Sequence, residues 1–226
     1  MSIIGLLAVV IGFAKTFFIP VADGNFDAPV SIHVHAAFAF AWVILFVIQT
    51  SLIHFNNYRL HQFLGVLGLL IAAGITVTMV PAGIFVVDRE LSQGLGNSAY
   101  SGLLGVVTSG LLFFALVVLG IINKNKPDYH KRFMLLATIV VLWPAWFRFR
   151  HYFPSVPRPD IWFALVLADS LIIIGWIWDK LKNGHVHPVL KFVGAFVIIE
   201  QCFEVIMFDT PKYQIVAKWL YSLMAA

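Results

Sequence analysis

The sequence predicts an all-α protein, an integral membrane bundle of about seven transmembrane helices with a short C-terminal amphipathic segment. The chain has 226 residues, of which 61% are hydrophobic and 12% are charged, and its mean hydropathy is +0.91. A soluble domain is about 25% charged, and its core cannot hold so large an apolar fraction. Because no polar stretch is long enough to form a separate unit, we expect a single transmembrane domain over residues 1–226.

The expected spans are apolar stretches of about 20 residues, the length that crosses a bilayer. They run over residues 2–20, 31–53, 61–87, 100–122, 131–150, 160–179 and 188–208, with Gly, Pro and Asn in the links. The first stretch has no basic residues before it and is long enough to remain as a span rather than a cleaved signal. After the last span, Ile215, Trp219 and Leu223 recur at helical spacing, which favours an amphipathic helix in the membrane interface.

The distribution of basic residues predicts the orientation of the chain. The net charge is +4, and basic loops of a membrane protein face the cytoplasm. The densest basic cluster, Lys124 to Arg132, falls on the same side as the N-terminus. We therefore expect a bacterial inner membrane protein with a cytoplasmic N-terminus and an external C-terminus, surrounded by lipid and without a nucleic-acid partner. The single cysteine, Cys202, excludes a disulfide within the chain.

Histidine is the most informative residue type, because all eight histidines lie near the expected helix ends. His61 and His130 begin two spans that run in the same direction, so both imidazoles should lie at one depth. Two imidazoles at one level on facing helices are the arrangement that ligates a b-type haem. The alternative is that each histidine caps its helix in the headgroup region.

A second group of histidines is expected on the opposite side of the membrane. His33 and His35 begin one span there, and His151 follows another. Glu200 and Glu204, four residues apart, share a helix face. These five residues could hold zinc or iron with an open position for water. Arg148 and Arg150 at the same level would neutralise haem propionates or an acidic ligand.

Several further polar residues fall inside expected spans, where charge is costly and usually faces the bundle interior. They are Lys15, Gln49 and Asp169. Lys15, the two glutamates, His35, Arg148 and His151 all fall in the outer half of the bilayer. They form one polar pocket in one interpretation, and interhelical salt bridges that fix packing in the other.

Three segments resemble a family of predicted bacterial multi-pass membrane proteins of unknown function. The first is Gly12-Phe13 with Thr16-Phe17-Phe18 and Pro20. The second is Ile32-His33-Val34-His35-Ala36, followed by Trp42, Gln49, Arg59, His61 and Gly65. The third runs from Lys126 to Met134 and contains His130-Lys131-Arg132. The resemblance covers roughly the first five spans, and it implies a membrane bundle without implying an activity.

The second and third spans also resemble, less closely, the transmembrane di-haem b-type cytochromes. In those proteins a histidine begins one helix, a glutamine follows, and another histidine begins the next helix shortly before a glycine. The resemblance implies that His35 and His61 ligate two different haems and that His130 partners His61. The span 100–122 has no histidine, so a second haem would need His151 or a different ligand beside His35.

Three functional hypotheses follow from these patterns. The leading one is a membrane redox or metal-binding protein, with haem b electron transfer as its concrete form and a quinone or another membrane redox protein as its partner. The second is a zinc- or iron-dependent membrane enzyme that acts on a lipid-like substrate. The third is a non-catalytic subunit or assembly factor of a larger membrane complex. A transporter with a proton relay through Lys15, Glu200 and Glu204 is a further option.

Overall fold

The predicted all-α bundle is confirmed by a computed structural model, which describes residues 1–225 and contains no strand in that range. The elements are α1 (Ser2–Phe13), η1 (Ala14–Phe18), α2 (Ile19–Ala22), α3 (Val30–His54), α4 (Tyr58–Ser92), α5 (Ser98–Ile122), α6 (Pro127–Phe147), η2 (Arg148–His151), η3 (Asp160–Leu167), α7 (Ala168–Asn183), η4 (Val189–Val193), α8 (Gly194–Met207) and α9 (Pro211–Met224). The segments η1, η3 and η4 are π-helical, and each continues directly into an α-helix.

Six helical segments within residues 1–225 are long and apolar enough to cross a membrane. They are Ser2–Ala22, Val30–His54, Tyr58–Ser92, Ser98–Ile122, Pro127–His151 and Asp160–Asn183. The seventh predicted span, 188–208, is also helical, as η4 and α8. Three charged residues, Lys191, Glu200 and Glu204, interrupt its apolar sequence.

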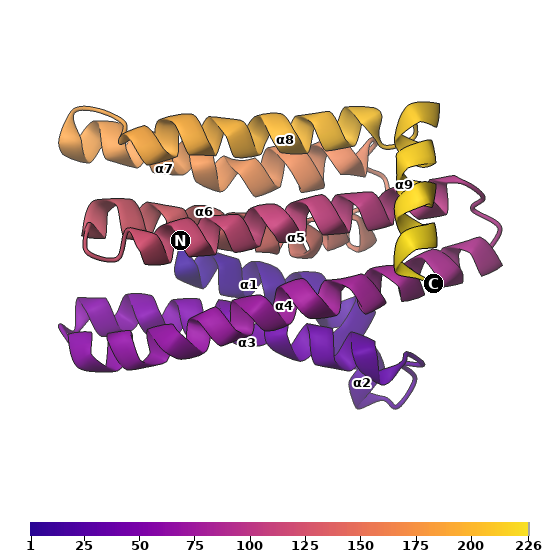
Figure 1. The fold of residues 1–226 in the computed structure, drawn as a ribbon, viewed down its shortest axis with the longest axis horizontal. Helices are drawn as coiled ribbons and strands as arrows, with labels where there is room; N and C mark the ends of the chain where they lie inside the picture. Colours follow the sequence, from indigo (N-terminus) through magenta and orange to yellow (C-terminus); the bar gives the residue numbers. More distant parts are fainter. Residues whose placement is uncertain (226) are drawn as a thin grey trace.

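The long helices run side by side, and the links at each end define two faces of the bundle (Figure 1). We call one the N-terminal face; it holds Met1 and the links 55–57, 123–126 and 184–188. The other, which we call the α9 face, holds the links 23–29, 93–97 and 152–159. Helix α9 crosses this face roughly perpendicular to the long helices. It packs on α5 through Tyr213 and Ala217, whereas Ile215 and Trp219 stay exposed.

Helix α6 is the centre of the bundle. It contacts α1, α3, α5, α7 and α8, and Leu136, Ile139 and Leu142 are fully buried. Helix α1 approaches it so closely that Gly12 faces the backbone carbonyl of Ala145, where no side-chain carbon would fit. Small residues that let two backbones meet are typical of helix packing in lipid.

The outer surface of the bundle is apolar. Large side chains such as Phe63, Leu181 and Ile206 are each more than 70% exposed. A soluble monomer seldom exposes apolar surface continuously over its helices. Hydrocarbon would cover this surface, in agreement with the low charge of the sequence.

A buried ion pair joins α6 to α7 at the N-terminal face. Arg132 donates from Nε and from a terminal nitrogen to the two carboxylate oxygens of Asp179, at 3.0 and 2.5 Å. The side chains of both residues are 6% exposed. Asp179 also accepts from the backbone nitrogen of His187 at 3.1 Å. One carboxylate therefore fixes α6, α7 and the link to η4.

The helix boundaries differ from the predicted ones by up to five residues, the largest difference being the end of α4 at Ser92 rather than 87. Helix α4 begins at Tyr58 rather than 61, because Asn57 accepts from the nitrogen of Leu60 and caps the helix. Helix α6 begins at Pro127 rather than 131. Proline is favoured in the first turn of a helix, where its missing N–H costs nothing.

We expect the Asp179→Asn variant to lower the free energy of unfolding by about 3 kcal/mol, because it removes the buried counter-charge of Arg132. Arg132 then keeps only the exposed carboxylate of Asp128, at 3.3 Å. Denaturant unfolding in detergent micelles, followed by circular dichroism, measures this loss. The control is Lys131→Gln, which removes an ion pair with Asp128 whose side chains are 61% and 67% exposed and should cost less than about 1 kcal/mol. Equal losses in the two variants would contradict the role given to Asp179.

The imidazole of His187 should make the bundle sensitive to acid. Its Nδ1 accepts from the backbone nitrogen of Val189 at 3.2 Å. Burial, followed by the charge of Arg132, lowers its pKa below the ordinary value of 6.5. The unfolded chain therefore binds a proton here more readily than the folded chain, and stability falls as the pH decreases from about 6.5 through the lower folded pKa. The His187→Asn variant, which keeps a neutral acceptor, should lose less stability in thermal unfolding over this range; an unchanged pH profile would refute this expectation.

Candidate functional site

The structure brings His61 and His130 together at the N-terminal face. His61 lies in the first turn of α4 and His130 in the first turn of α6. The ring centroids are 6.2 Å apart, and the ring planes are nearly perpendicular, at 88°. Helices α3, α4, α5 and α6 pack in sequence, each against the next. The two imidazoles thus meet in a T-shaped arrangement at the end of a four-helix unit.

The Nδ1 atoms of the two imidazoles differ in their hydrogen bonding. The Nδ1 of His130 is 2.9 Å from the carbonyl oxygen of Gly120, so it donates and leaves Nε2 as an acceptor or ligand. The Nδ1 of His61 is buried without a hydrogen-bond partner. The amide of Gln49 donates to the carbonyl of His61 at 3.2 Å, while its own Oε1 is also buried and unpartnered. Two buried polar atoms without a partner, His61 Nδ1 and Gln49 Oε1, therefore belong to neighbouring side chains.

The spacing of the two rings fits one metal atom between them. A metal–nitrogen bond of about 2.0–2.1 Å on each side places the centroids of two opposed imidazoles roughly 6 Å apart. Gly65, one turn after His61, leaves open space, since only the amide nitrogen of Gln49 comes as near as 4.0 Å to a methyl group built there. A porphyrin needs a wider slot than a bare ion, and α4 and α6 would have to part around it.

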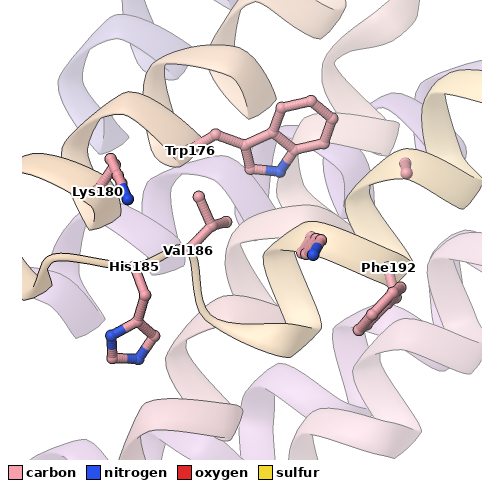
Figure 2. A pocket seen from close by; sticks show the side chains of 7 residues that line it. Trp176, Lys180, His185, Val186 and Phe192 are labelled. Carbon is pink, nitrogen blue, oxygen red and sulfur yellow. The ribbon is translucent and has the colours of Figure 1, made fainter.

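Two hollows among the described residues lie elsewhere on the N-terminal face. One of about 750 Å³ opens between α7 and η4 and is lined by Trp176, Lys180, His185, Val186, Lys191, Phe192 and Ala195 (Figure 2). The indole of Trp176 donates to the carbonyl of Leu190 at 2.6 Å, so it closes the inner wall. The other, of about 580 Å³, lies beside Met1, Phe46 and Arg132. Neither hollow contains His61 or His130.

The histidines predicted for the opposite side each contact different residues. His33 packs its ring against Phe17 and Phe26, with centroids 6.1 and 5.4 Å away. The Nδ1 of His35 is 3.0 Å from the hydroxyl of Thr78 on α4. The carbonyl of His151 accepts from the Lys15 ammonium at 3.2 Å.

The metal site predicted from His33, His35, His151, Glu200 and Glu204 stays a prediction. Within residues 1–225, the structure shows no group of three or more His, Cys, Asp or Glu side chains placed to hold a metal ion.

The predicted outer pocket divides into a basic part and an acidic part. In the basic part, Arg148 donates to the hydroxyl of Thr16 at 3.1 Å and lies over the ring of Phe13 at 4.0 Å. Arg150 lies 3.8 Å over the ring of Phe147. Lys15 lies over Tyr152. These residues are on the α9 face, far along α6 from His130, so they belong to a different level of the bundle from the paired histidines.

The acidic part comprises Asp169, Glu200 and Glu204, on α7 and α8. Both carboxylate oxygens of Asp169 and one of Glu200 are buried without a hydrogen-bond partner. Glu204 contacts α5 at Gly105. Among residues 1–225, none of the four ion pairs includes a member of this group.

Sequence reasoning missed some residues that matter here. Thr78 was passed over because a single threonine in an apolar span has no distinctive pattern. Arg132 belongs to the basic cluster that predicts the orientation, and a single aspartate at the end of a span, such as Asp179, has no distinctive pattern. Ser101, Gly105 and Ser109 follow one another at intervals of four on α5, and that spacing was a signal for a polar helix face.

Comparison with protein-family models, curated proteins and solved structures finds no match to this chain.

Proposed function

We propose that the chain is an integral membrane redox protein in which His61 and His130 bind the iron of a b-type haem at the N-terminal face. The observation that carries the proposal is the pair of perpendicular imidazoles with centroids 6.2 Å apart. The buried, unpartnered Nδ1 of His61 supports it further, because such atoms in a folded protein usually mark a missing ligand or water.

The surroundings of the pair suit a redox centre. A ligand imidazole is normally oriented by a hydrogen bond from its other nitrogen, which also raises its basicity; the bond from His130 to Gly120 supplies this. Haem iron with two histidine ligands would supply one-electron transfer. The chain's own part is to hold the imidazoles at fixed spacing, on rigid helices, in an apolar environment that sets the potential.

The main alternative is a single transition-metal ion between the same two histidines. His61 and His130 line neither of the two hollows. A single ion needs less space between the helices than a porphyrin does, which favours this alternative. Haem is preferred because two imidazoles alone leave an ion short of the four ligands usual for zinc. The zinc- or iron-dependent enzyme built on His35, His151 and the glutamates has no comparable geometric support.

We further propose that the N-terminal face is cytoplasmic, in a bacterial inner membrane. Eight Lys and Arg residues lie in or beside the links of that face, and six on the α9 side. Cytoplasmic loops carry the excess of basic residues. A redox centre at this face would exchange electrons with a cytoplasmic or quinone partner at the membrane surface.

The protein purified from cells supplied with a haem precursor should show a Soret band and a reduced-minus-oxidised spectrum typical of b-type haem. His61→Ala and His130→Ala should each lose most of it, because one axial ligand is removed. His54→Ala, at the same face but outside the pair, is the matched control and should keep the spectrum. Circular dichroism of every variant checks that the helices remain.

Two outcomes would overturn the haem proposal. One is a folded wild-type protein with no Soret band from cells in which haem is abundant. The other is a haem spectrum that both alanine variants retain. A transition metal found by elemental analysis in wild type but lost in both variants, without a chromophore, would replace haem by a bare ion.

The orientation predicts opposite labelling of two introduced cysteines. In a Cys202→Ser background, Gln93→Cys lies in an exposed link of the α9 face and Lys124→Cys in an exposed link of the N-terminal face. A membrane-impermeant maleimide should label position 93 in intact spheroplasts and position 124 only after permeabilisation. The reverse pattern would invert the orientation, and labelling of both from one side would show that α5 does not span.

A further inference from the structure

Three carboxylates lie inside the helical bundle without a positive partner. Asp169 is 5% exposed, and neither of its carboxylate oxygens has a hydrogen-bond partner. Glu200 and Glu204 follow on α8, four residues apart and so about 6 Å apart along the axis. The four ion pairs among residues 1–225 involve other residues.

The three carboxylates form a connected series. Asp169 is near enough to Glu200 for the two charges to interact, and Glu200 interacts in the same way with Glu204. Glu204 lies one turn before the end of α8, and Asp169 lies more than two turns into the segment that begins at Asp160. The series therefore runs from near the α9 face toward the bundle interior.

A polar face of α5 lies against the outer end of this series. Ser101, Gly105 and Ser109 recur every four residues and share that face. The carboxylate of Glu204 contacts Gly105 and lies near the hydroxyl of Ser109. Ser101, one turn before Gly105, is 0% exposed, and its hydroxyl has no partner. Buried hydroxyl groups normally have a hydrogen-bond partner. The unpartnered hydroxyl of Ser101, one turn from the contact of Glu204 with α5, is therefore available to bind water or another polar group.

Helix α9 adds a further polar group from the membrane surface. Tyr213 is 8% exposed, and its pKa is raised by burial and then by the charges of Glu204 and Glu200. Its hydroxyl therefore lies within the field of both carboxylates. The other titratable group beside the series is the thiol of Cys202, which interacts with Asp169.

Buried polar atoms without partners concentrate here. Eight such side-chain atoms occur in residues 1–225, and five of them belong to Ser101, Asp169, Glu200 and Gln201. Buried polar atoms normally bond to protein or to internal water. Three neighbouring carboxylates in an apolar region cannot all be ionised without a cation, because burial and like charge both favour the neutral acid.

We propose that Asp169, Glu200 and Glu204 form a hydrated proton-binding site that exchanges protons with the α9 face past Tyr213. Each proton taken up neutralises one carboxylate, and Ser101 and Ser109 of α5 hydrogen-bond the water and the acid. The site is independent of the paired histidines, which lie at the opposite face of the bundle.

The test uses dicyclohexylcarbodiimide, an apolar reagent that modifies protonated carboxyl groups in lipid-like surroundings. The full-length protein in detergent is labelled across about pH 5 to 9, and adducts are located by peptide mass spectrometry. We expect adducts on Glu200 or Glu204 near neutral pH, with a yield that falls as the pH rises. Asp209, which is exposed near the same face, is the internal control and should stay unmodified.

The Glu200→Gln variant distinguishes a coupled proton site from isolated carboxyls. Removing the charge of Glu200 takes a like charge away from Glu204 and makes Glu204 harder to protonate. The pH at which Glu204 loses half of its labelling should therefore move downward. Ser92→Ala, at an exposed position of α4, is the matched control and should leave that pH unchanged.

Three results would overturn the proposal. The first is a folded wild-type protein with no adduct on any of the three carboxylates at any pH. The second is an adduct on Asp209 as abundant as that on the glutamates, which would show unselective reaction. The third is protection by sodium chloride but not by choline chloride at one pH, which would make the site one for a sodium ion. The experiment can be repeated in the His61→Ala variant, so its result does not depend on haem binding.

Discussion

The structure depends on one constraint, which is that every buried polar group must find a partner where water is scarce. Hydrocarbon offers no hydrogen bonds, so the backbone satisfies itself within helices and the chain has no strand in residues 1–225. Side chains that cannot satisfy themselves locally must find one another between helices. Arg132 and Asp179 do so as a closed ion pair. His61, Asp169 and Glu200 each keep at least one buried polar atom without a partner, and these exceptions are the basis of the two proposed sites.

The two candidate sites lie at opposite ends of the bundle and use different helices. The paired histidines belong to α4 and α6, with α3 and α5 on either side. The carboxylates belong to α7 and α8. Glu204 contacts α5, which in turn packs against α9. Helix α6 lies between α5 and α7 and contacts α8 as well. A redox change at one end and proton uptake at the other would thus share one central helix.

Much of the fold could be predicted from the sequence because the period and length of apolar runs decide which segments are helical in lipid. Helices α3 and α5 begin and end within two residues of their predicted limits. Topological parity also placed His61 and His130 at one level, and the structure brings them together. The number of spans that precede a residue indicates its depth in the membrane. It does not indicate which neighbouring helix the side chain faces. For that reason the sequence groups His35 and His151 with Glu200 and Glu204, whereas in the structure His35 bonds Thr78 and Glu204 contacts α5.

The ion pair of Arg132 has a consequence for the histidine two residues before it. At 100° per residue, side chains two positions apart on a helix point in nearly opposite directions. Arg132 is held on the α7 side of α6, so His130 must face away, toward α5 and α4. Asp179 thus sets the rotation of α6 about its own axis. The direction in which the His130 imidazole points therefore depends on an ion pair on the opposite side of the helix, although Asp179 contacts neither ring of the pair.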